Sequence, residues 1–160
     1  MIIRPITEAD FTSLRRIYLN GIATGHATFE TTAPGWHEWH RSHLTHSRLI
    51  ALTGDEAAGW AALSPVSSRC VYGGVAEVSV YVATAHQSKG IGRMLLRELV
   101  SESEKNGIWT LEAGIFPENK ASIRIHEQCG FRLVGRREKP GKINGVWKDV
   151  LFYERRSAIN

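Results

Sequence analysis

The sequence predicts a single mixed α/β domain. Runs rich in β-branched and aromatic residues alternate with stretches whose apolar residues recur at helical spacing, as in α/β proteins. The chain has 160 residues, which is enough to bury a sizeable core as one domain. Hydrophobic residues make up 42% and charged residues 22%, a balance typical of globular rather than disordered chains.

The first elements are a strand over residues 2–6 and a helix from Phe11 to near Gly21. Thr7 and Asp10 have the spacing of a capping box ahead of this helix. After a loop over 27–35, a second helix is expected from Trp36 to about Thr45. The remaining elements are expected as strands 49–52 and 57–63 around a turn at 53–56, a polar loop 64–74, a strand ending at Val82, a helix from Ile91 capped by Gly107, a strand 108–116, a helix 119–129 stopped by Gly130, and strands 131–134 and 146–153.

The most informative stretch is a glycine-containing loop, residues 87–92, between an apolar strand and an amphipathic helix. Such a loop presents several backbone N–H groups at the positive end of a helix, which suits a pyrophosphate. A Walker loop would need Gly-Lys-Ser/Thr, but Gly92 is followed by Arg93 and Met94. A dinucleotide-binding fold would place its glycines after an early strand. A purely structural turn is the remaining alternative.

The charge balance and the cysteines limit the classes of partner. The net charge is +4 with a pI of about 9.3, but lysines and arginines are dispersed, and no nucleic-acid-binding module is recognisable. A polyanionic cofactor accounts for the excess equally well. No apolar run reaches the roughly 20 residues of a membrane span. Cys70 and Cys129 follow no disulfide or zinc pattern, which predicts reduced, buried or half-buried thiols and a cytoplasmic location.

Five stretches, in the right order, resemble the phosphinothricin N-acetyltransferase family of the GNAT superfamily. They are residues 17–18 with 27–31, 69–72 with 76–82, 87–92, 119–131 and 145–150. The resemblance covers nearly the whole chain, residues 1–160, as one domain. It implies the GNAT fold, with a central mixed, mostly antiparallel sheet flanked by helices. It also implies a homodimer that transfers acetyl directly from acetyl-CoA to the amino group of phosphinothricin, methionine sulfoximine or methionine sulfone in a ternary complex.

The same resemblance implies an acetyl-CoA site. The pantetheine arm is expected to pair with backbone groups of Val80, Tyr81 and Val82. The other expected contacts come from the loop and from the helix after the next strand: Gln87, Ser88, Lys89, Gly90, Ile91, Gly92, Arg93, Asn119 and Ser122. Asn119 could equally be only a helix N-cap, and Lys89 could equally be a solvated lysine.

Two residues are candidates for proton transfer. Forming an amide needs a neutral amine, so a carboxylate at the pocket wall is required as base. Glu77 is a lone charge entering an apolar strand, and it lies where the family has its proposed base. The alternative is an exposed strand-end glutamate or an ion-pair member. His126 stands where many GNAT enzymes have a tyrosine, so it is a candidate acid for the leaving thiolate, a packed helix residue, or a hydrogen-bond partner of the cofactor.

The acceptor is expected to be a small amino-acid-like molecule. Arg69 offers a planar donor fork for a carboxylate or phosphinate, although it could also be a surface loop residue. Tyr72 and Ser79 are expected in the same pocket. Phe29 and Glu30 are also expected to line it, although Phe29 could instead only pack in the core. No metal is expected. Four histidines recur every three residues: His37, His40, His43 and His46. Each step of three turns the side chain by about 60° around a helix, so the four imidazoles cannot converge on one metal ion. They are therefore expected on a solvated helix face.

Other functions remain open at this point. The acceptor could be another amine, such as a polyamine or a protein N-terminus. A noncatalytic module that senses acyl-CoA would bind the cofactor but be indifferent to a change of Glu77 to glutamine. Nucleic-acid binding is the weakest alternative.

Overall fold

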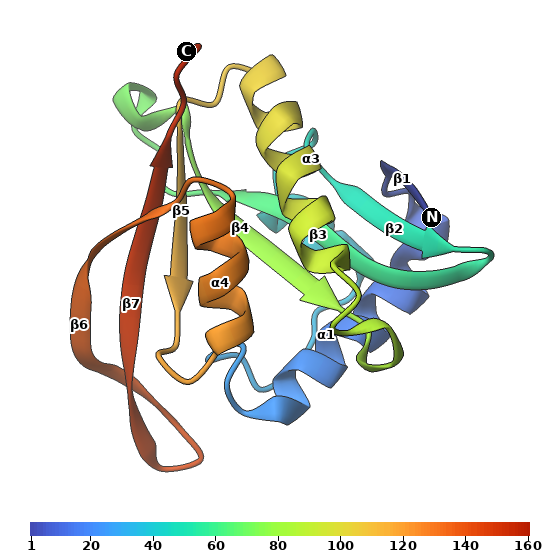
Figure 1. The fold of residues 1–160 in the computed structure, drawn as a ribbon, viewed down its shortest axis with the longest axis horizontal. Helices are drawn as coiled ribbons and strands as arrows, with labels where there is room; N and C mark the ends of the chain where they lie inside the picture. Colours follow the sequence, from blue (N-terminus) through green and yellow to red (C-terminus); the bar gives the residue numbers. More distant parts are fainter.

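The computed structural model describes residues 1–160 as one seven-stranded sheet with four α-helices (Figure 1). The strands are β1 (Ile2–Pro5), β2 (Leu49–Thr53), β3 (Glu56–Pro65), β4 (Val75–Val82), β5 (Thr110–Ile115), β6 (Arg132–Ile143) and β7 (Val146–Arg156). The helices are α1 (Phe11–Thr24), α2 (Trp36–Ser42), α3 (Ile91–Lys105) and α4 (Lys120–Gln128). The predicted order of strands and helices is confirmed.

The sheet has the order β1-β2-β3-β4-β5-β7-β6. Every neighbouring pair is antiparallel except β4 and β5, which run parallel. Helices α3 and α4 cover one face of the sheet, and α1 lies against the other (Figure 1). Each face therefore has its own core. One contains Leu95, Leu96 and Leu99 of α3, and the other contains Leu14 and Ile17 of α1 with Trp39 and Trp60.

Helix α1 continues past Gly21 to Thr24, so the predicted end near Gly21 is wrong. A Cβ atom on Gly21 would lie 2.8 Å from Cδ1 of Tyr81. The glycine is therefore needed for the close approach of α1 to β4, and the helix instead ends at Gly25, whose φ is +74°. This left-handed conformation is one that glycine adopts without strain.

The start of α1 is fixed by Asp10. Its carboxylate accepts hydrogen bonds from the Thr7 backbone N–H at 2.8 Å and from the Thr7 hydroxyl at 3.0 Å, and it also pairs with Arg4. The predicted carboxylate half of the capping arrangement is thus present, on a short 3₁₀ turn (Glu8–Asp10) ahead of α1. Helix α2 ends at Ser42 rather than Thr45 because His43 adopts an extended backbone conformation.

Strand β6 was predicted to end at Val134 but extends to Ile143. Its second half is polar and carries Pro140, features that argue against a strand in the interior of a sheet. It forms one here because β6 is an edge strand, where a proline is tolerated, and because it pairs with β7 through irregular register steps. Asp149 joins the two strands, accepting from Nε of Arg136 at 2.7 Å and from the Lys139 backbone N–H at 3.0 Å.

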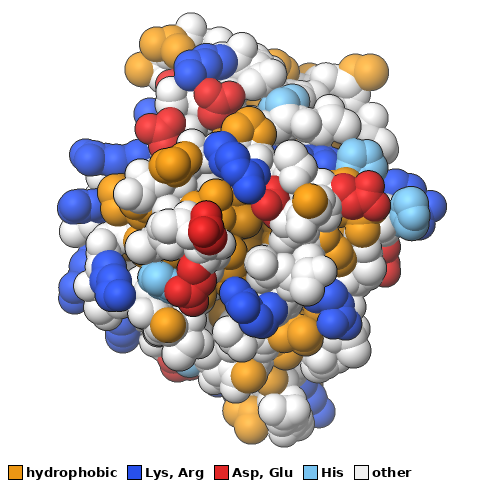
Figure 2. All heavy atoms as spheres, turned by 90° about the vertical axis from the view of Figure 1, so that its right-hand side faces the viewer, with side chains coloured by type: hydrophobic (Ala, Val, Ile, Leu, Met, Phe, Trp, Pro, Cys, Tyr) orange, Lys and Arg blue, Asp and Glu red, His pale blue; other side chains and the backbone are white.

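No helix in the structure is both long and apolar enough to cross a membrane. Figure 2 shows the side of the molecule that lies on the right in Figure 1, where positive, negative and apolar side chains are intermingled. Cys70 is exposed and Cys129 half-buried, and both are free thiols. The prediction of a buried or half-buried thiol is therefore wrong for Cys70, which lies on the 3₁₀ turn Cys70–Tyr72 outside the core.

Candidate functional site

The parallel pairing of β4 and β5 is short. Only Val75–Glu77 pairs with Thr110–Glu112, after which the two strands diverge, as the arrows in Figure 1 show. The rest of β4 still pairs with β3 on its other side. Backbone N–H and C=O groups that β4 directs toward β5 beyond Glu77 therefore lack a strand partner, and an extended ligand can pair with them.

A cleft of about 1450 Å³ occupies the gap between the diverging strands. It is lined by β4 from Glu77 onward, the end of β5, the start of α3, most of α4, the loop 26–34, and the far half of β6. Side chains alternate along β4, so Glu77, Ser79 and Tyr81 face the α1 side while Val78, Val80 and Val82 pack on the α3 side. The cleft thus opens to both faces of the sheet.

The glycine loop lies where β4 reaches α3. Ser88 has a φ of 62° and Gly90 one of 81°, and left-handed residues of this kind turn successive N–H groups toward one side. No turn or loop hydrogen bond uses the N–H groups of Ser88, Lys89 or Gly90. A Cβ on Gly92 would lie 3.2 Å from Cδ1 of Ile125, so Gly92 lets α3 approach α4 closely. The loop therefore fits a pyrophosphate at the N-terminus of α3.

Helix α4 supplies a second wall. The Asn119 side chain caps it by accepting from the Ser122 N–H at 3.2 Å, and both residues line the cleft, so the N-cap role and a cofactor contact are compatible. His126 is buried, and its Nδ1 donates to the Ser122 carbonyl at 2.7 Å. Its Nε2 has no partner, and its ring packs edge-on against Phe131. Burial lowers the pKa of His126, which favours the neutral imidazole.

Glu77 stands at the point where β4 and β5 separate, in the last paired position of the ladder. Its outer atoms reach solvent in the cleft, yet the surrounding protein displaces enough water to raise the pKa of its carboxyl group. Tyr81, four residues further along β4 and on the same side, is stacked on Trp60 at 5.1 Å and meets Tyr18 edge-on at 5.0 Å. Burial raises the pKa of Tyr81, so this residue is a neutral phenol.

The loop over residues 27–35 closes one end of the cleft. Phe29 packs edge-on against Phe116 with ring centroids 4.7 Å apart, and a Cβ on Gly141 of β6 would lie 3.0 Å from its ring. Phe29 and Glu30 both line the cleft. Phe29 therefore combines the packing role with a place in the wall of the cleft.

The structure brings most of the predicted site residues together. Those that line the cleft are Phe29, Glu30, Glu77, Ser79, Val80, Tyr81, Val82, Gln87, Ser88, Ile91, Gly92, Asn119, Ser122 and His126. Lys89, Gly90 and Arg93 belong to the glycine loop and α3 but not to this lining. Arg69 and Tyr72 lie outside it too, exposed, with the Arg69 guanidinium 5.4 Å from the Tyr72 ring.

Several cleft residues were not predicted. Arg137 on β6 lines the cleft, is exposed and makes no ion pair, whereas its neighbour Arg136 is held by Asp149. Trp60 and Phe116 also line the cleft, and the sequence predicts neither as a site residue. The long β6–β7 hairpin brings Arg137 to the cleft, and a sequence reading that ends β6 at Val134 could not have found it.

No cluster of three or more His, Cys, Asp or Glu residues is placed to hold a metal ion. His37 and His40 are exposed as expected for a solvated helix face. That expectation is wrong for His43, which stacks on Trp39 at 4.2 Å and lines the cleft, because α2 ends just before it.

The comparisons with known proteins agree with this geometry. The family model described as "Acetyltransferase (GNAT) family" matches residues 11–131. An L-methionine sulfoximine/L-methionine sulfone acetyltransferase of Salmonella typhimurium is 31% identical over 166 residues, covering 96% of this chain and 93% of the relative.

Two solved structures are similar over almost the whole chain. A GNAT superfamily phosphinothricin acetyltransferase from Sinorhizobium meliloti, in complex with AcCoA, has a TM-score of 0.88 and 30% identity, covering 97% of this chain and 87% of that one. A ribosomal-protein-alanine N-acetyltransferase from Brucella melitensis has a TM-score of 0.91 and 32% identity, covering 98% and 100%. The predicted fold class is confirmed.

Proposed function

Since this chain belongs to the GNAT acetyltransferase family and uses acetyl-CoA, we propose that it acetylates the amino group of a small amino-acid-like acceptor. Phosphinothricin, methionine sulfoximine and methionine sulfone are the proposed acceptors, and the single domain over residues 1–160 carries the reaction. One observation supports this most: the separation of β4 from β5 places Glu77 at the apex of a cleft that ends at the glycine loop. Donor and acceptor can therefore meet in one cleft, and direct transfer is proposed.

The donor would lie along β4. The pantetheine arm would pair with the unpartnered backbone edge over Val80, Tyr81 and Val82, and the pyrophosphate would meet the N–H groups of the glycine loop. Lys89 and Arg93 would add positive charge at the loop, and Asn119 and Ser122 would contact the arm from α4. These assignments leave the acceptor on the α1 side of β4, where Glu77 and Ser79 point.

Glu77 would act as the base. An acceptor ammonium gives one proton to the Glu77 carboxylate, directly or through water, and becomes a neutral amine. The amine lone pair forms the new C–N bond to the thioester carbonyl carbon, and the C–S bond breaks as the CoA thiolate leaves. The nitrogen then releases its second proton to water, which gives the neutral amide. The raised pKa of Glu77 makes its carboxylate a stronger base than an ordinary glutamate.

The CoA thiolate needs a proton when it leaves. That His126 donates this proton stays a prediction. In the neutral state, the Nδ1–H group of His126 already donates a hydrogen bond to the Ser122 carbonyl. The lowered pKa of His126 also makes the imidazolium scarce at neutral pH. Its burial and its contact with Phe131 favour the packing role instead. Protonation of the thiolate by water requires nothing further from the chain.

We propose that Arg137, an exposed cation in the cleft lining without an ion pair, binds the acidic group of the acceptor. Replacing Arg137 with alanine is then expected to raise KM for the acceptor by about 10-fold or more, because this charged hydrogen-bonding partner is lost. The KM for acetyl-CoA should not change. Arg69→Ala is the matched comparison, since Arg69 lies outside the cleft of its own chain. If only Arg69→Ala raised the KM for the acceptor, the acidic group of the acceptor would instead be bound by Arg69 from a second copy of the chain.

The acceptor class is tested by measuring thiol release from acetyl-CoA with a panel of amines. The panel contains phosphinothricin, methionine sulfoximine, methionine sulfone, ordinary amino acids, spermidine and an alanine-initiated peptide. Turnover with the first three supports the proposal. A preference for the peptide would favour the second candidate, acetylation of a protein N-terminus, which is suggested by the similarity to the ribosomal-protein-alanine N-acetyltransferase from Brucella melitensis. Binding of acetyl-CoA without turnover of any amine would favour a sensing module.

We also propose a homodimer in the cytoplasm. Apolar side chains are exposed on the edge hairpin and on the loop before β4: Val66, Val71, Tyr72, Leu133, Val134, Val146 and Trp147. A dimer interface over the hairpin and this loop would cover these side chains. The two free thiols suit a reducing compartment. Light scattering coupled to size-exclusion chromatography distinguishes a dimer from a 17.9 kDa monomer.

A further inference from the structure

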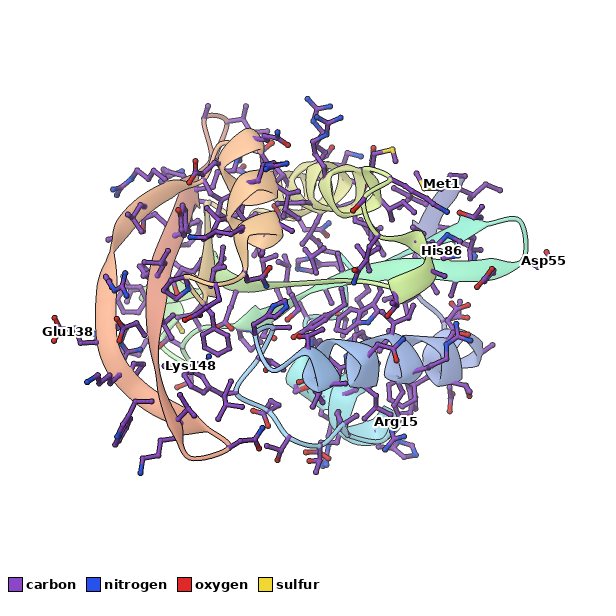
Figure 3. All side chains as sticks on the ribbon, turned by 60° about the horizontal axis from the view of Figure 1, so that its bottom comes forward. Met1, Arg15, Asp55, His86, Glu138 and Lys148 are labelled. Atoms are coloured by element: carbon purple, nitrogen blue, oxygen red, sulfur yellow. The ribbon has the colours of Figure 1, made fainter.

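The imidazole of His43 lies on the acceptor side of the cleft. His43 follows α2, and its ring stacks on Trp39 with centroids 4.2 Å apart and meets Trp60 edge-on at 6.4 Å. Both indoles belong to the core between α1 and the sheet. Figure 3 shows α1 on one side of the sheet and α3 and α4 on the other. His43 is therefore on the α1 side, the face to which Glu77 and Ser79 point.

The backbone places His43 across β3 from the proposed base. The N–H of Leu44 donates to the Leu63 carbonyl at 2.8 Å, so the chain that follows α2 runs beside β3. Ser64, the next residue of β3, lines the cleft and pairs in register with Glu77. Neighbouring strands are about 4.8 Å apart. An acceptor whose amino group meets Glu77 can therefore extend its side chain over β3 towards His43, which also lines the cleft.

The hydrogen bonds of His43 determine which ring nitrogen carries a proton. Its Nδ1 lies 2.7 Å from the carbonyl oxygen of Trp39, which can only accept, so Nδ1 is protonated and donates. In the neutral ring, Nε2 then carries a lone pair and no hydrogen. Unlike the Nε2 atoms of His86 and His126, which are buried without a partner, Nε2 of His43 is accessible to solvent. His43 thus offers the cleft one hydrogen-bond acceptor and no donor.

Two features keep this nitrogen unprotonated and in place. Burial lowers the pKa of His43, and the positive charge of Arg48 lowers it further, against the opposing effect of the hydrogen bond to Trp39. Arg48 is itself buried, and its Nη2 donates to the carbonyls of His40 and His43 at 2.9 and 3.0 Å. These bonds satisfy carbonyl groups at the C-terminal end of α2. The lone pair of Nε2 is therefore presented to the cleft at a fixed position.

We propose that His43 is a specificity-determining residue, whose Nε2 accepts a hydrogen bond from an N–H or O–H group on the side chain of the acceptor. The inference rests on the proposed function and deepens it, because it ranks the proposed acceptors. Methionine sulfoximine has an N–H group on its sulfur where methionine sulfone has a second oxygen. An oxygen placed opposite the lone pair of Nε2 leaves both atoms without a partner. Methionine sulfoximine is therefore the preferred acceptor of the two.

The test compares kcat/KM for methionine sulfoximine and methionine sulfone at saturating acetyl-CoA. The wild-type chain is expected to prefer the sulfoximine by about 10-fold, the contribution of one hydrogen bond. His43→Phe keeps a ring that stacks on Trp39 but has no lone pair. In this variant the preference should disappear through a slower reaction of the sulfoximine, with KM for acetyl-CoA unchanged. His37→Phe is the matched control, because His37 is exposed on α2 and lies outside the cleft.

A ¹⁵N NMR spectrum of the wild-type chain with labelled histidines and bound CoA gives a second readout, which does not depend on the folding of a variant. The Nε2 signal of His43 is expected to be that of an unprotonated nitrogen. It should move when methionine sulfoximine is added and not when methionine sulfone is added.

The outcomes separate the inference from the proposed function. A protonated Nε2, equal wild-type rates with both acceptors, or an unchanged preference in folded His43→Phe would overturn the inference and leave the proposed acceptor class intact. Acetylation of another amine, with neither of these two amino acids turned over, would overturn the proposed acceptor class and the inference with it. Thermal unfolding shows whether His43→Phe is folded.

Discussion

Glu77→Gln is expected to lower kcat/KM for the acceptor by about 10²–10⁴-fold, the usual contribution of a positioned base. Glutamine keeps the shape of the side chain but cannot take the proton of the ammonium. Because burial raises the pKa of Glu77, wild-type activity should fall as the pH drops through a value above the ordinary pKa of a glutamate, where the carboxylate becomes protonated. Steady-state rates at several pH values measure both effects.

The affinity for acetyl-CoA serves as the control for this variant. It should be unchanged, because the donor is proposed to bind the backbone of β4 and the glycine loop. Activity within a factor of two of wild type, with intact cofactor binding, would remove Glu77 from the mechanism. Equal losses of activity and of acetyl-CoA affinity would indicate a structural role for Glu77 instead.

Gly74→Ala is expected to destabilise the protein by about 3 kcal/mol, at the upper end for an overpacked site. A Cβ on Gly74 would lie 2.0 Å from Cε3 of Trp109. The indole cannot easily move away, because the Trp109 and Thr110 N–H groups both donate to the Gly74 carbonyl, at 2.8 and 3.1 Å. Thermal unfolding should show a Tm lower by about 6–12 °C.

This substitution should also reduce activity, since Gly74 and Trp109 hold together the start of the β4–β5 pairing from which the cleft opens. Gly135→Ala is the matched control, because a Cβ there meets no atom within 4 Å and the residue has no positive φ. An unchanged Tm in Gly74→Ala would mean that the indole of Trp109 is free to rearrange.

The sequence predicted the elements of the fold better than their limits. The helix periodicity and the β-branched runs placed every strand and helix in order, because both follow from local patterns. The end of α1 was wrong because Gly21 serves a contact with Tyr81, 60 positions away. The length of β6 was missed because a polar edge strand is specified by its partner β7 rather than by its own pattern.

The site shows the same division. The position of Glu77 and of the glycine loop at the cleft could be predicted, because each lies in consecutive residues of one strand or one loop. Arg137 could not, since only the twist and length of the β6–β7 hairpin bring it to the cleft. The pairing of Glu77 with Glu112 depends on the register of two strands separated by a helix, which the sequence does not state.

Initial-rate kinetics with acetyl-CoA and methionine sulfoximine varied together test the proposed direct transfer most directly. If both reactants meet in the one cleft between β4 and β5, double-reciprocal plots intersect, and no acetylated protein is found by mass spectrometry when the acceptor is absent. Parallel lines together with an acetyl group on the chain would contradict direct transfer and would require a nucleophilic side chain that carries the acetyl group from one reactant to the other.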